Sequence, residues 1–300
     1  MLVSFSRACH PPGMGKKRAI LLALSFAALA GGLVWTLSRP AEPAYQGKPL
    51  SAWLNEYNGL PGDTNQAACA AVRELGTNAI PALLKIIESG DPPFQRMISE
   101  LNRVQSLVHF PLRDTWLQRE AASSALYAMG ANAKPAFPAL TSLLFDTNTA
   151  DLSALPLAGM GSEGLPPLIV ALKDQNAFIR HQAVNGLGME RSDLDIVVPA
   201  LIARLSDQDM RVHLATVAAL GHLHAEPGLA VPALMKDFPG NDPVLRLRIV
   251  LAIEQFETNA SAAIPMLLEA LSDNDETVRI VAASALKRID PEAAAKAGVK

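Results

Sequence analysis

Residues 265–286 read PMLLEALSDNDETVRIVAASAL, and three earlier stretches of the chain follow the same pattern. The four copies open at Pro166, Pro199, Pro232 and Pro265, which lie 33 residues apart. Self-similarity at one fixed period of this length is typical of solenoids built from stacked pairs of helices. The repeat therefore predicts an all-α protein that consists of about seven stacked helix pairs.

Each copy also predicts where its two helices begin. Because a first-turn N–H has no helical partner to lose, the four prolines are expected to start the first helix of each pair. Ten residues later stand side chains that cap helix N-termini, and these are expected to start the second helix. The predicted caps are Asn176, Asp209, Asp242 and Asp275. The rows predicted to be buried in the first helix are Leu168, Leu201, Leu234 and Leu267, then Leu172, Leu205, Phe238 and Leu271.

Earlier parts of the chain repeat less regularly. Residues 65–76 and 119–130 match the second helix, and the stretches that start at Asn78 and Phe137 match the first. Residues 92–117 are expected to form an extra or lengthened helix that is broken at Pro111. Residues 146–164 are expected to form a weak unit with Pro156 in its second helix, and a short capping helix is expected from Asp290.

The second helix of the last copy resembles HEAT repeats of the short bacterial type found in phycobilisome-lyase-like proteins. Val278 and Arg279 followed by Ala282, Ala283, Ala285 and Leu286 carry this resemblance, which covers about Lys48 to Asp290. The opening YQGKPLSAWLNEY from Tyr45 also looks like the start of an uncharacterised family of membrane-anchored bacterial HEAT proteins. The resemblance implies a right-handed α-solenoid, an armadillo-type superhelix, that acts as a protein-interaction scaffold.

The N-terminal region predicts a membrane segment. Residues 19–37 read AILLALSFAALAGGLVWTL without a charge, and Lys16, Lys17 and Arg18 precede them. A stretch of this length just crosses the hydrocarbon core, and positive charge stays on the cytoplasmic side. We expect an uncleaved single-pass anchor in the cytoplasmic membrane, with the N-terminus inside and the solenoid outside. The alternative is a signal peptide cleaved after Ala30, which would leave a secreted or periplasmic protein.

The predicted domain organisation follows from these features. Residues 1–18 form a basic cytoplasmic tail, 19–37 the transmembrane anchor or signal peptide, 38–47 a linker, 48–290 the solenoid, and 291–300 a C-terminal cap or tail. Since MGKKR from Met14 is a compact basic start, we hypothesise that translation begins at Met14.

Composition and charge narrow the classes of partner and chemistry. A formal net charge of -3 and a pI near 6.1 argue against a nucleic-acid binder, which normally has a basic face. Cys9 and Cys69 lie in unrelated regions, and their spacing is not that of a metal site or of a predicted disulfide.

One polar column recurs with the repeat: Arg180, His213, Arg246 and Arg279 each follow their proline by fourteen residues. This column could be a cationic ladder for an acidic partner. The helical wheel, however, places it within the packed arc of the second helix. We therefore interpret it as a structural ladder that bonds acids or carbonyls of the adjacent repeat, with Asp174, Asp207 and Asp273 recurring as acids. Gly240 takes the acid position in the third copy, so Arg246 is expected to use Asp242 or backbone instead.

The opposite arc of the second helices is the candidate binding face. In HEAT-like solenoids this helix usually lines the concave, partner-binding surface. Its outward positions here include what we call the apolar strip: Leu214, Leu247, Leu251, Ile280 and Val281. Either neighbouring second helices cover part of the strip, or it is a groove for a protein or peptide.

Catalytic and metal chemistry have no recognisable motif in the sequence. His222 and His224 lie on different helix faces, His181 and His213 belong to different copies, and no acid or cysteine cluster accompanies them. We expect no metal, no cofactor and no catalytic constellation. The leading hypothesis is a membrane-anchored scaffold for a protein or peptide partner. The alternatives are a chromophore-lyase-like or chaperone-type HEAT protein, and a structural envelope protein without a specific ligand.

Overall fold

The computed structural model describes residues 42–56, 66–89, 115–239 and 242–299. The predicted anchor over 19–37, the basic tail before it and most of the extra helix predicted within 92–117 lie outside the described residues. Among the residues that are described, no helix is long and apolar enough to span a bilayer. The described residues from Pro43 onward form one compact unit.

A short hairpin opens this unit. Strand β1 (Ala44–Tyr45) pairs antiparallel with β2 (Lys48–Pro49), and both residues of the connecting turn, Gln46 and Gly47, have positive φ. Positive φ at both central residues matches the twist of two antiparallel strands. The indole of Trp53 donates a hydrogen bond to the Tyr45 carbonyl, so the hairpin is tied to the first helix. The linker predicted for 38–47 is therefore partly wrong, because its last residues belong to the folded unit.

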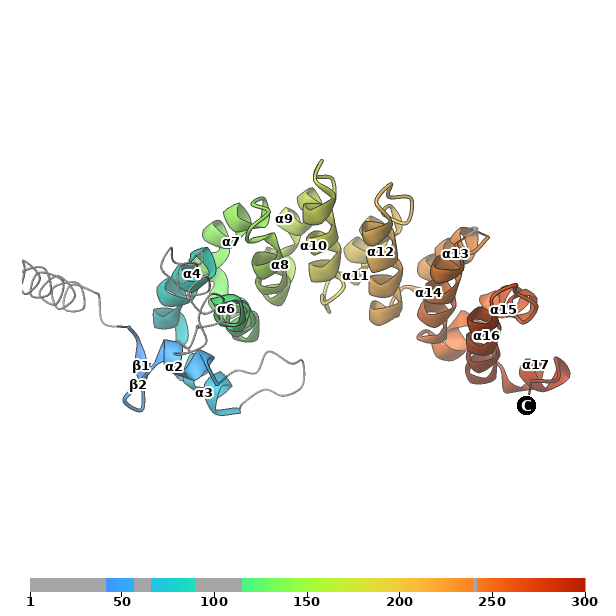
Figure 1. Ribbon diagram of the computed structural model, residues 1–300, viewed down its shortest axis with the longest axis horizontal. Coiled ribbons are helices and arrows are strands. Elements are labelled where there is room, and N and C mark those ends of the chain that lie inside the picture. The colour runs from blue at the N-terminus through green and yellow to red at the C-terminus, as the bar shows by residue number, and fades with distance from the viewer. Residues whose placement is uncertain (1–41, 57–65, 90–114, 240–241, 300) are drawn as a thin grey trace, which may run out of the picture. The chain divides into compact units, whose positions relative to one another are not determined.

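The remainder of the unit is a succession of helix pairs (Figure 1). The described residues contain seven pairs, in agreement with the repeat period. They are α2 (Leu50–Leu54) with α3 (Gln66–Leu75), α4 (Ile80–Glu88) with α6 (Thr115–Met129), α7 (Phe137–Leu144) with α8 (Ala150–Gly159), α9 (Leu165–Ala171) with α10 (Ala177–Leu187), α11 (Leu194–Ile202) with α12 (Met210–Leu223), α13 (Pro227–Asp237) with α14 (Pro243–Glu254), and α15 (Ile264–Ala270) with α16 (Glu276–Ile289). Helix α17 (Pro291–Lys296) follows as the expected cap.

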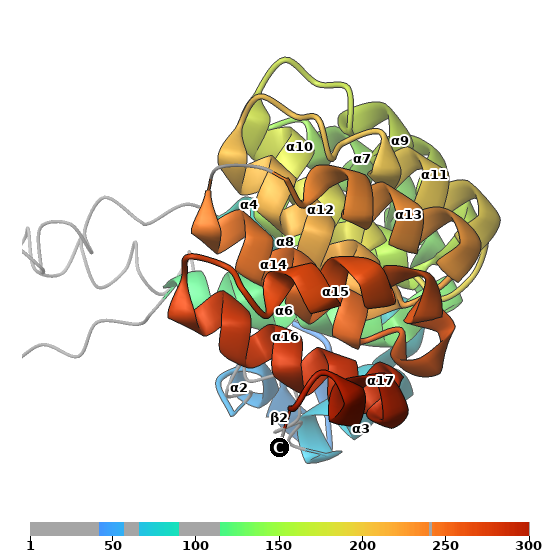
Figure 2. The same cartoon turned by 90° about the vertical axis from the view of Figure 1, so that its right-hand side faces the viewer.

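The two helices of each pair form two layers. In the later repeats the first helices α9, α11, α13 and α15 lie on one side and the second helices α10, α12, α14 and α16 on the other (Figure 2). Short 3₁₀ segments lead into several first helices: η1 (Gly76–Ala79), η2 (Gly130–Ala136), η3 (Gly161–Glu163) and η4 (Glu257–Ala263). Each second helix packs against the next one along the chain, so the candidate face is a row of parallel second helices.

Burial follows the predicted rows. Leu168, Leu201, Leu234 and Leu267 are completely buried, and the row one turn later is buried except for Leu271, which is half-buried. All four predicted caps accept a hydrogen bond from a backbone N–H of the second helix: Asn176 from Phe178, Asp209 from Arg211, Asp242 from Val244, and Asp275 from Thr277 and Val278. The repeat therefore predicted the core and the starts of the second helices correctly.

Two expectations about helix boundaries are wrong. Helices α11 and α13 begin five residues before Pro199 and Pro232, at Leu194 and Pro227. Asp193 and Glu226 adopt left-handed conformations that turn the chain early, and an extra turn of helix follows them. Both prolines are exposed residues inside their helices, whereas Pro166 and Pro265 do lie in the first turn because 3₁₀ segments precede them.

The weak unit predicted over 146–164 is also corrected. Its only helix longer than one turn in the described chain is α8, which packs against α7 and completes the repeat that begins at Phe137. Pro156 lies within α8 and is buried. The sequence suggested a separate unit because α8 has polar and proline positions that blur its helical pattern.

Candidate partner-binding face

A common register relates neighbouring second helices. The Arg191 guanidinium lies 2.9 Å from His222 Nε2, Ser284 Oγ donates to Glu254 (3.0 Å), and Arg288 donates to Glu257 (2.6 Å). In each case the two residues are separated by 30 or 31 positions. Ser284 and Glu254 lie on the second helices α16 and α14, whereas Arg191 and Glu257 lie just beyond the ends of α10 and α14. Gly221 of α12 and Ala252 of α14, which are 31 positions apart, also lie close together.

Small residues hold the row closely together. A Cβ added at Gly221 would lie 2.7 Å from the Cα of Ala252, and one added at Gly186 would lie 2.9 Å from the carbonyl oxygen of Ala154. Such distances leave no room for a methyl group, so α12 approaches α14, and α10 approaches α8, with backbone nearly in contact. The glycines and alanines of the second helices thus fix the spacing of the face.

The arginines of the ladder connect adjacent repeats through paired hydrogen bonds. Arg180 donates through Nε (2.9 Å) and Nη2 (2.8 Å) to the two carboxylate oxygens of Asp207, whose side chain is only 3% exposed. Arg246 makes the same arrangement with Asp273, at 2.7 Å and 2.8 Å. Bidentate charge-assisted bonds of this kind are among the strongest polar contacts in proteins. These arginines are therefore engaged inside the solenoid.

Two members of the ladder differ. His213 lies 2.6 Å from Asp237, on α13, and Arg279 donates through Nη1 to the carbonyls of Asp273 (2.7 Å) and Asn274 (3.2 Å). The expectation that Gly240 would deprive Arg246 of its acid is wrong, because Arg180 and Arg246 pair with the acid of the following repeat. The residue that faces the Gly240 repeat is His213, and it bonds an aspartate three positions earlier.

Electrostatic shifts agree with the ion pairs. The side-chain bond from Arg180 is the largest cause of a lowered pKa at Asp207, and the bond from Arg246 acts in the same way on Asp273. The hydrogen bonds to these aspartates in turn raise the pKa of both arginines. All four groups are therefore charged at neutral pH, and each cation is already neutralised by its partner.

The apolar strip is partly accessible. Ile280 is 62% exposed. Leu214, Leu247 and Val281 are half-buried and pack against the core, and Leu251 is half-buried. Neighbouring second helices thus cover part of the strip, while α16 presents one strongly exposed side chain and α14 a partly open one.

Two exposed side chains near this face were not among the predicted binding residues. Val244, 49% exposed, lies in the first turn of α14, and Met210, 45% exposed, lies in the first turn of α12. The register of 30 positions places Val244 beside Leu214. The available signal was an apolar residue one or two positions after an N-cap, as Met210 follows Asp209 and Val244 follows Asp242.

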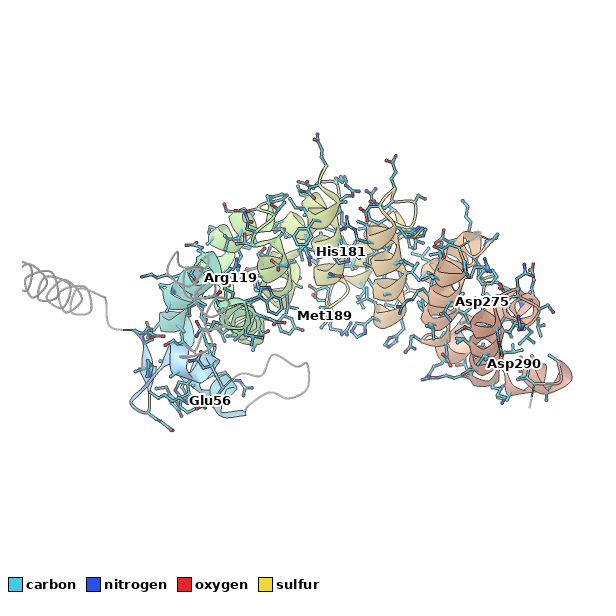
Figure 3. All side chains as sticks on the ribbon, in the orientation of Figure 1. Glu56, Arg119, His181, Met189, Asp275 and Asp290 are labelled. Atoms are coloured by element: carbon cyan, nitrogen blue, oxygen red, sulfur yellow. The ribbon has the colours of Figure 1, made fainter. Side chains whose placement is uncertain are left out.

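The outward side of α10 carries polar side chains that bond one another. His181 lies near the middle of α10 and Met189 just beyond its end (Figure 3). Burial, and to a lesser extent the nearby Arg211, lowers the pKa of His181. Asn185 donates to Gln182 (3.3 Å), so these outward groups are partly satisfied by one another. The apolar part of the face therefore begins at α12.

A metal site, a reactive cysteine and a ligand pocket are the other kinds of functional site that this chain could contain. No three histidine, cysteine, aspartate or glutamate side chains lie close enough to hold a metal ion among the described residues. The side chain of Cys69 lies outside the described residues. A depression of about 540 Å³ lies at the ends of α7 and α9, lined by Phe145, Ile169, Val170, Lys173, Asp174 and Gln175. It does not include the apolar strip.

The architecture defines the class of the protein: an α-solenoid of stacked helix pairs. Residues 231–297 match the family of HEAT repeats. The fold is similar to that of Kap121p in its crystal structure bound to Nup53p, with a TM-score of 0.50 and 16% identity over 80% of this chain. The chain spans 29% of the Kap121p chain. Residues 231–297 thus match HEAT repeats, and the similarity to Kap121p is one of fold.

Two further structures are similar at lower scores. One is an engineered protein, with a TM-score of 0.41 and 18% identity over 83% of this chain and 71% of that chain. The other is the complex of CpcE and CpcF of phycocyanin lyase from Nostoc sp. PCC7120, with a TM-score of 0.38 and 18% identity over 87% of this chain and 96% of that chain. No curated protein matches the sequence.

Proposed function

We propose that this protein is a membrane-anchored HEAT-repeat scaffold that binds a protein or peptide on the face lined by its second helices, without catalysing a reaction. The exposed part of the apolar strip carries the proposal. Ile280 on α16 and Val244 on α14 are exposed apolar side chains on the row of second helices. Charged side chains on or near this row, such as Arg211, Arg246 and Arg288, are paired with acids. Exposed apolar groups that follow one face of a solenoid are typical of partner surfaces.

The energetics favour a binding surface of moderate strength. Covering a half-exposed valine or isoleucine contributes on the order of 1 kcal/mol, so a few such side chains give weak binding by themselves. A partner that also contacts the flanking polar residues, and that is held near the bilayer, gains from a high effective concentration. The proposed mechanism is therefore capture of a partner along several repeats at once.

The proposed anchor is residues 19–37, with the N-terminus in the cytoplasm and the repeats on the other side of the cytoplasmic membrane. It rests on the uncharged apolar stretch and on the preceding basic residues. Extraction of membranes at alkaline pH tests it. The full chain should remain in the membrane pellet, and a chain without residues 1–37 should be released. Release of both chains equally would contradict an uncleaved anchor.

Site-specific photo-crosslinking tests the binding face in the native membrane. A photoreactive amino acid replaces Ile280 in one strain and Leu268, which is 40% exposed on the first helix α15, in a matched control strain. We expect a discrete crosslinked partner band at position 280 and a much weaker band at position 268. Equal bands at the two positions, or none at 280, would show that the second-helix face is not the partner surface.

A further inference from the structure

Arg248 is an exposed arginine in the middle of the apolar strip. It lies on α14 directly after Leu247 and three residues before Leu251. The nearby cations have acids: Arg211 bonds Asp209 (2.8 Å), Arg288 bonds Glu257 (2.6 Å) and Arg246 bonds Asp273. Within the described part of the chain, Arg248 has no ion-pair partner. It is thus a charge that the fold places at the surface but does not neutralise there.

The acids around the strip are already engaged or lie at its margin. Asp209 accepts from Arg211, Glu254 accepts from Ser284 (3.0 Å), and Glu257 accepts from Arg288. Glu276 lies in the first turn of α16, where a carboxylate favours the positive end of the helix dipole. The positive charge of the Arg248 guanidinium, at the centre of the strip, is therefore not paired with any of these acids.

The neighbouring helix leaves Arg248 accessible. Ala218 of α12 lies 30 positions before Arg248 and is exposed and small. The same separation relates Ser284 of α16 to Glu254 of α14, whose side chains are bonded. A small side chain at Ala218 therefore leaves room for an anion at the Arg248 guanidinium.

We propose that the partner of this face is a peptide segment that combines acidic and apolar side chains, with one carboxylate paired to Arg248 and apolar groups on Val244, Leu251 and Ile280. The inference rests on the proposed function. A planar guanidinium binds a carboxylate through two parallel hydrogen bonds, which fixes the register of the segment. Arginine surrounded by apolar contacts is also a frequent centre of binding energy in protein interfaces.

The length of the segment follows from helix packing. Neighbouring helices lie roughly 10 Å apart, so the distance from α12 to α16 is on the order of 20 Å. An extended chain covers this distance with about six residues, and a helix with about thirteen. A displayed library of random peptides of about 14 residues is therefore long enough for both conformations.

The experiment selects peptides on the full-length protein reconstituted in lipid nanodiscs, with empty nanodiscs for counter-selection. The selected consensus peptide is then titrated against wild type, Ile280→Glu, Arg248→Ala, Arg248→Lys and Lys236→Glu. Lys236 is an exposed lysine on the first-helix layer and provides the charge control. Circular dichroism melting confirms that each variant folds.

We expect selected peptides rich in aspartate or glutamate near apolar residues. Arg248→Ala should weaken binding by about tenfold or more, Arg248→Lys should restore part of the loss, and Lys236→Glu should leave affinity unchanged. Peptides that lose affinity with Ile280→Glu but not with Arg248→Ala would overturn the acidic partner and leave the binding face intact. Peptides insensitive to both substitutions, or no selected peptides at all, would overturn both proposals.

Discussion

The four repeats from α9 to α16 and the three from α2 to α8 solve the same structural problems with different groups. In the later repeats, Arg180 and Arg246 bond carboxylates of the next repeat, and the second helices begin at side-chain caps. In the earlier repeats, Arg119 donates instead to the carbonyls of Ile87 and Asn148, both at 2.8 Å. The arginines of the later half thus bond buried carboxylates of the next repeat, whereas Arg119 of the earlier half bonds carbonyls.

The turns between repeats differ in the same way. Each turn needs a residue with positive φ, and after α3, α6 and α8 that residue is Gly76, Gly130 or Gly161. After α10, α12 and α14 the corresponding residues are Asp193, Glu226 and Glu257, with φ of 48°, 47° and 51°. Glycine adopts this conformation without strain, whereas in other residues it costs about 1 kcal/mol or more of conformational free energy. Since repeat stabilities are approximately local, single substitutions can separate the two strategies.

The largest expected effect comes from breaking a buried ion pair of the later half. Asp207→Ala leaves Arg180 without its carboxylate and removes the bond that Asp207 accepts from the Asp209 N–H (3.0 Å). We expect a loss of about 3 kcal/mol in the free energy of unfolding, because a partly buried guanidinium remains unpaired. Hydrogen exchange of α10 and α12, measured by mass spectrometry, should speed up accordingly.

Two comparisons control this prediction. Arg211→Ala breaks the exposed pair with Asp209 and should change stability far less than Asp207→Ala, because water screens an exposed pair. Acid provides the second control. The pKa of Asp207 is lowered in the fold by Arg180, so its stabilisation is present above the unfolded-state pKa and is lost as the pH falls below about 4. The difference between wild type and Asp207→Ala should shrink in acid, and a constant difference would show that the ion pair is not its cause.

A smaller effect is expected from closing the space between second helices. Gly221→Ala places a methyl group 2.7 Å from Ala252 Cα, so α12 and α14 must separate. Overpacking exceeds the gain in helix propensity, and we expect a net loss of about 1 kcal/mol. Gly228→Ala in α13 is the matched change, since a Cβ there meets no atom within 4 Å. Thermal unfolding should show a lowered midpoint for the first variant alone. Equal midpoints would mean that the helices are not in tight contact at Gly221.

The sequence predicted the parts of this fold that repeat. Fixed spacing located the buried leucine rows, the four caps of the second helices and the arginine ladder, because every copy must satisfy the same packing. It failed where one copy departs from the others: Pro199 and Pro232 are not at helix starts, and His213 rather than Arg246 faces the altered repeat. Those outcomes depend on turn geometry and on contacts one repeat away, neither of which a single copy contains.

The sequence predicted which residues of the second helices point outward, but not how exposed each of them is. A helical wheel separates inward from outward positions, and it placed Ile280 outside correctly. It cannot show how far the next helix reaches, so Leu214, Leu247 and Val281 appeared as open as Ile280 although they pack against the core. It also gave no reason to single out Arg248, whose significance depends on the ion pairs that occupy its neighbours. Partner chemistry thus required the register between helices as well as the sequence.

The smallest expected effect concerns the turns, and here neighbouring repeats decide the result. Asp193 accepts a hydrogen bond from the Ser162 hydroxyl, and Glu257 accepts one from Arg288 at 2.6 Å. Glu226 has no such bond within the described residues. Glu226→Gly should therefore relieve backbone strain and raise the free energy of unfolding by about 0.5 kcal/mol, after the entropy cost of glycine in the unfolded chain. Asp193→Gly and Glu257→Gly should be close to neutral, because the lost bond offsets the relieved strain. Chemical denaturation of the three variants would measure the order. If all three gained equally, the acidic side chains would contribute nothing to these turns, and the later half would differ from the earlier one only in its ion pairs.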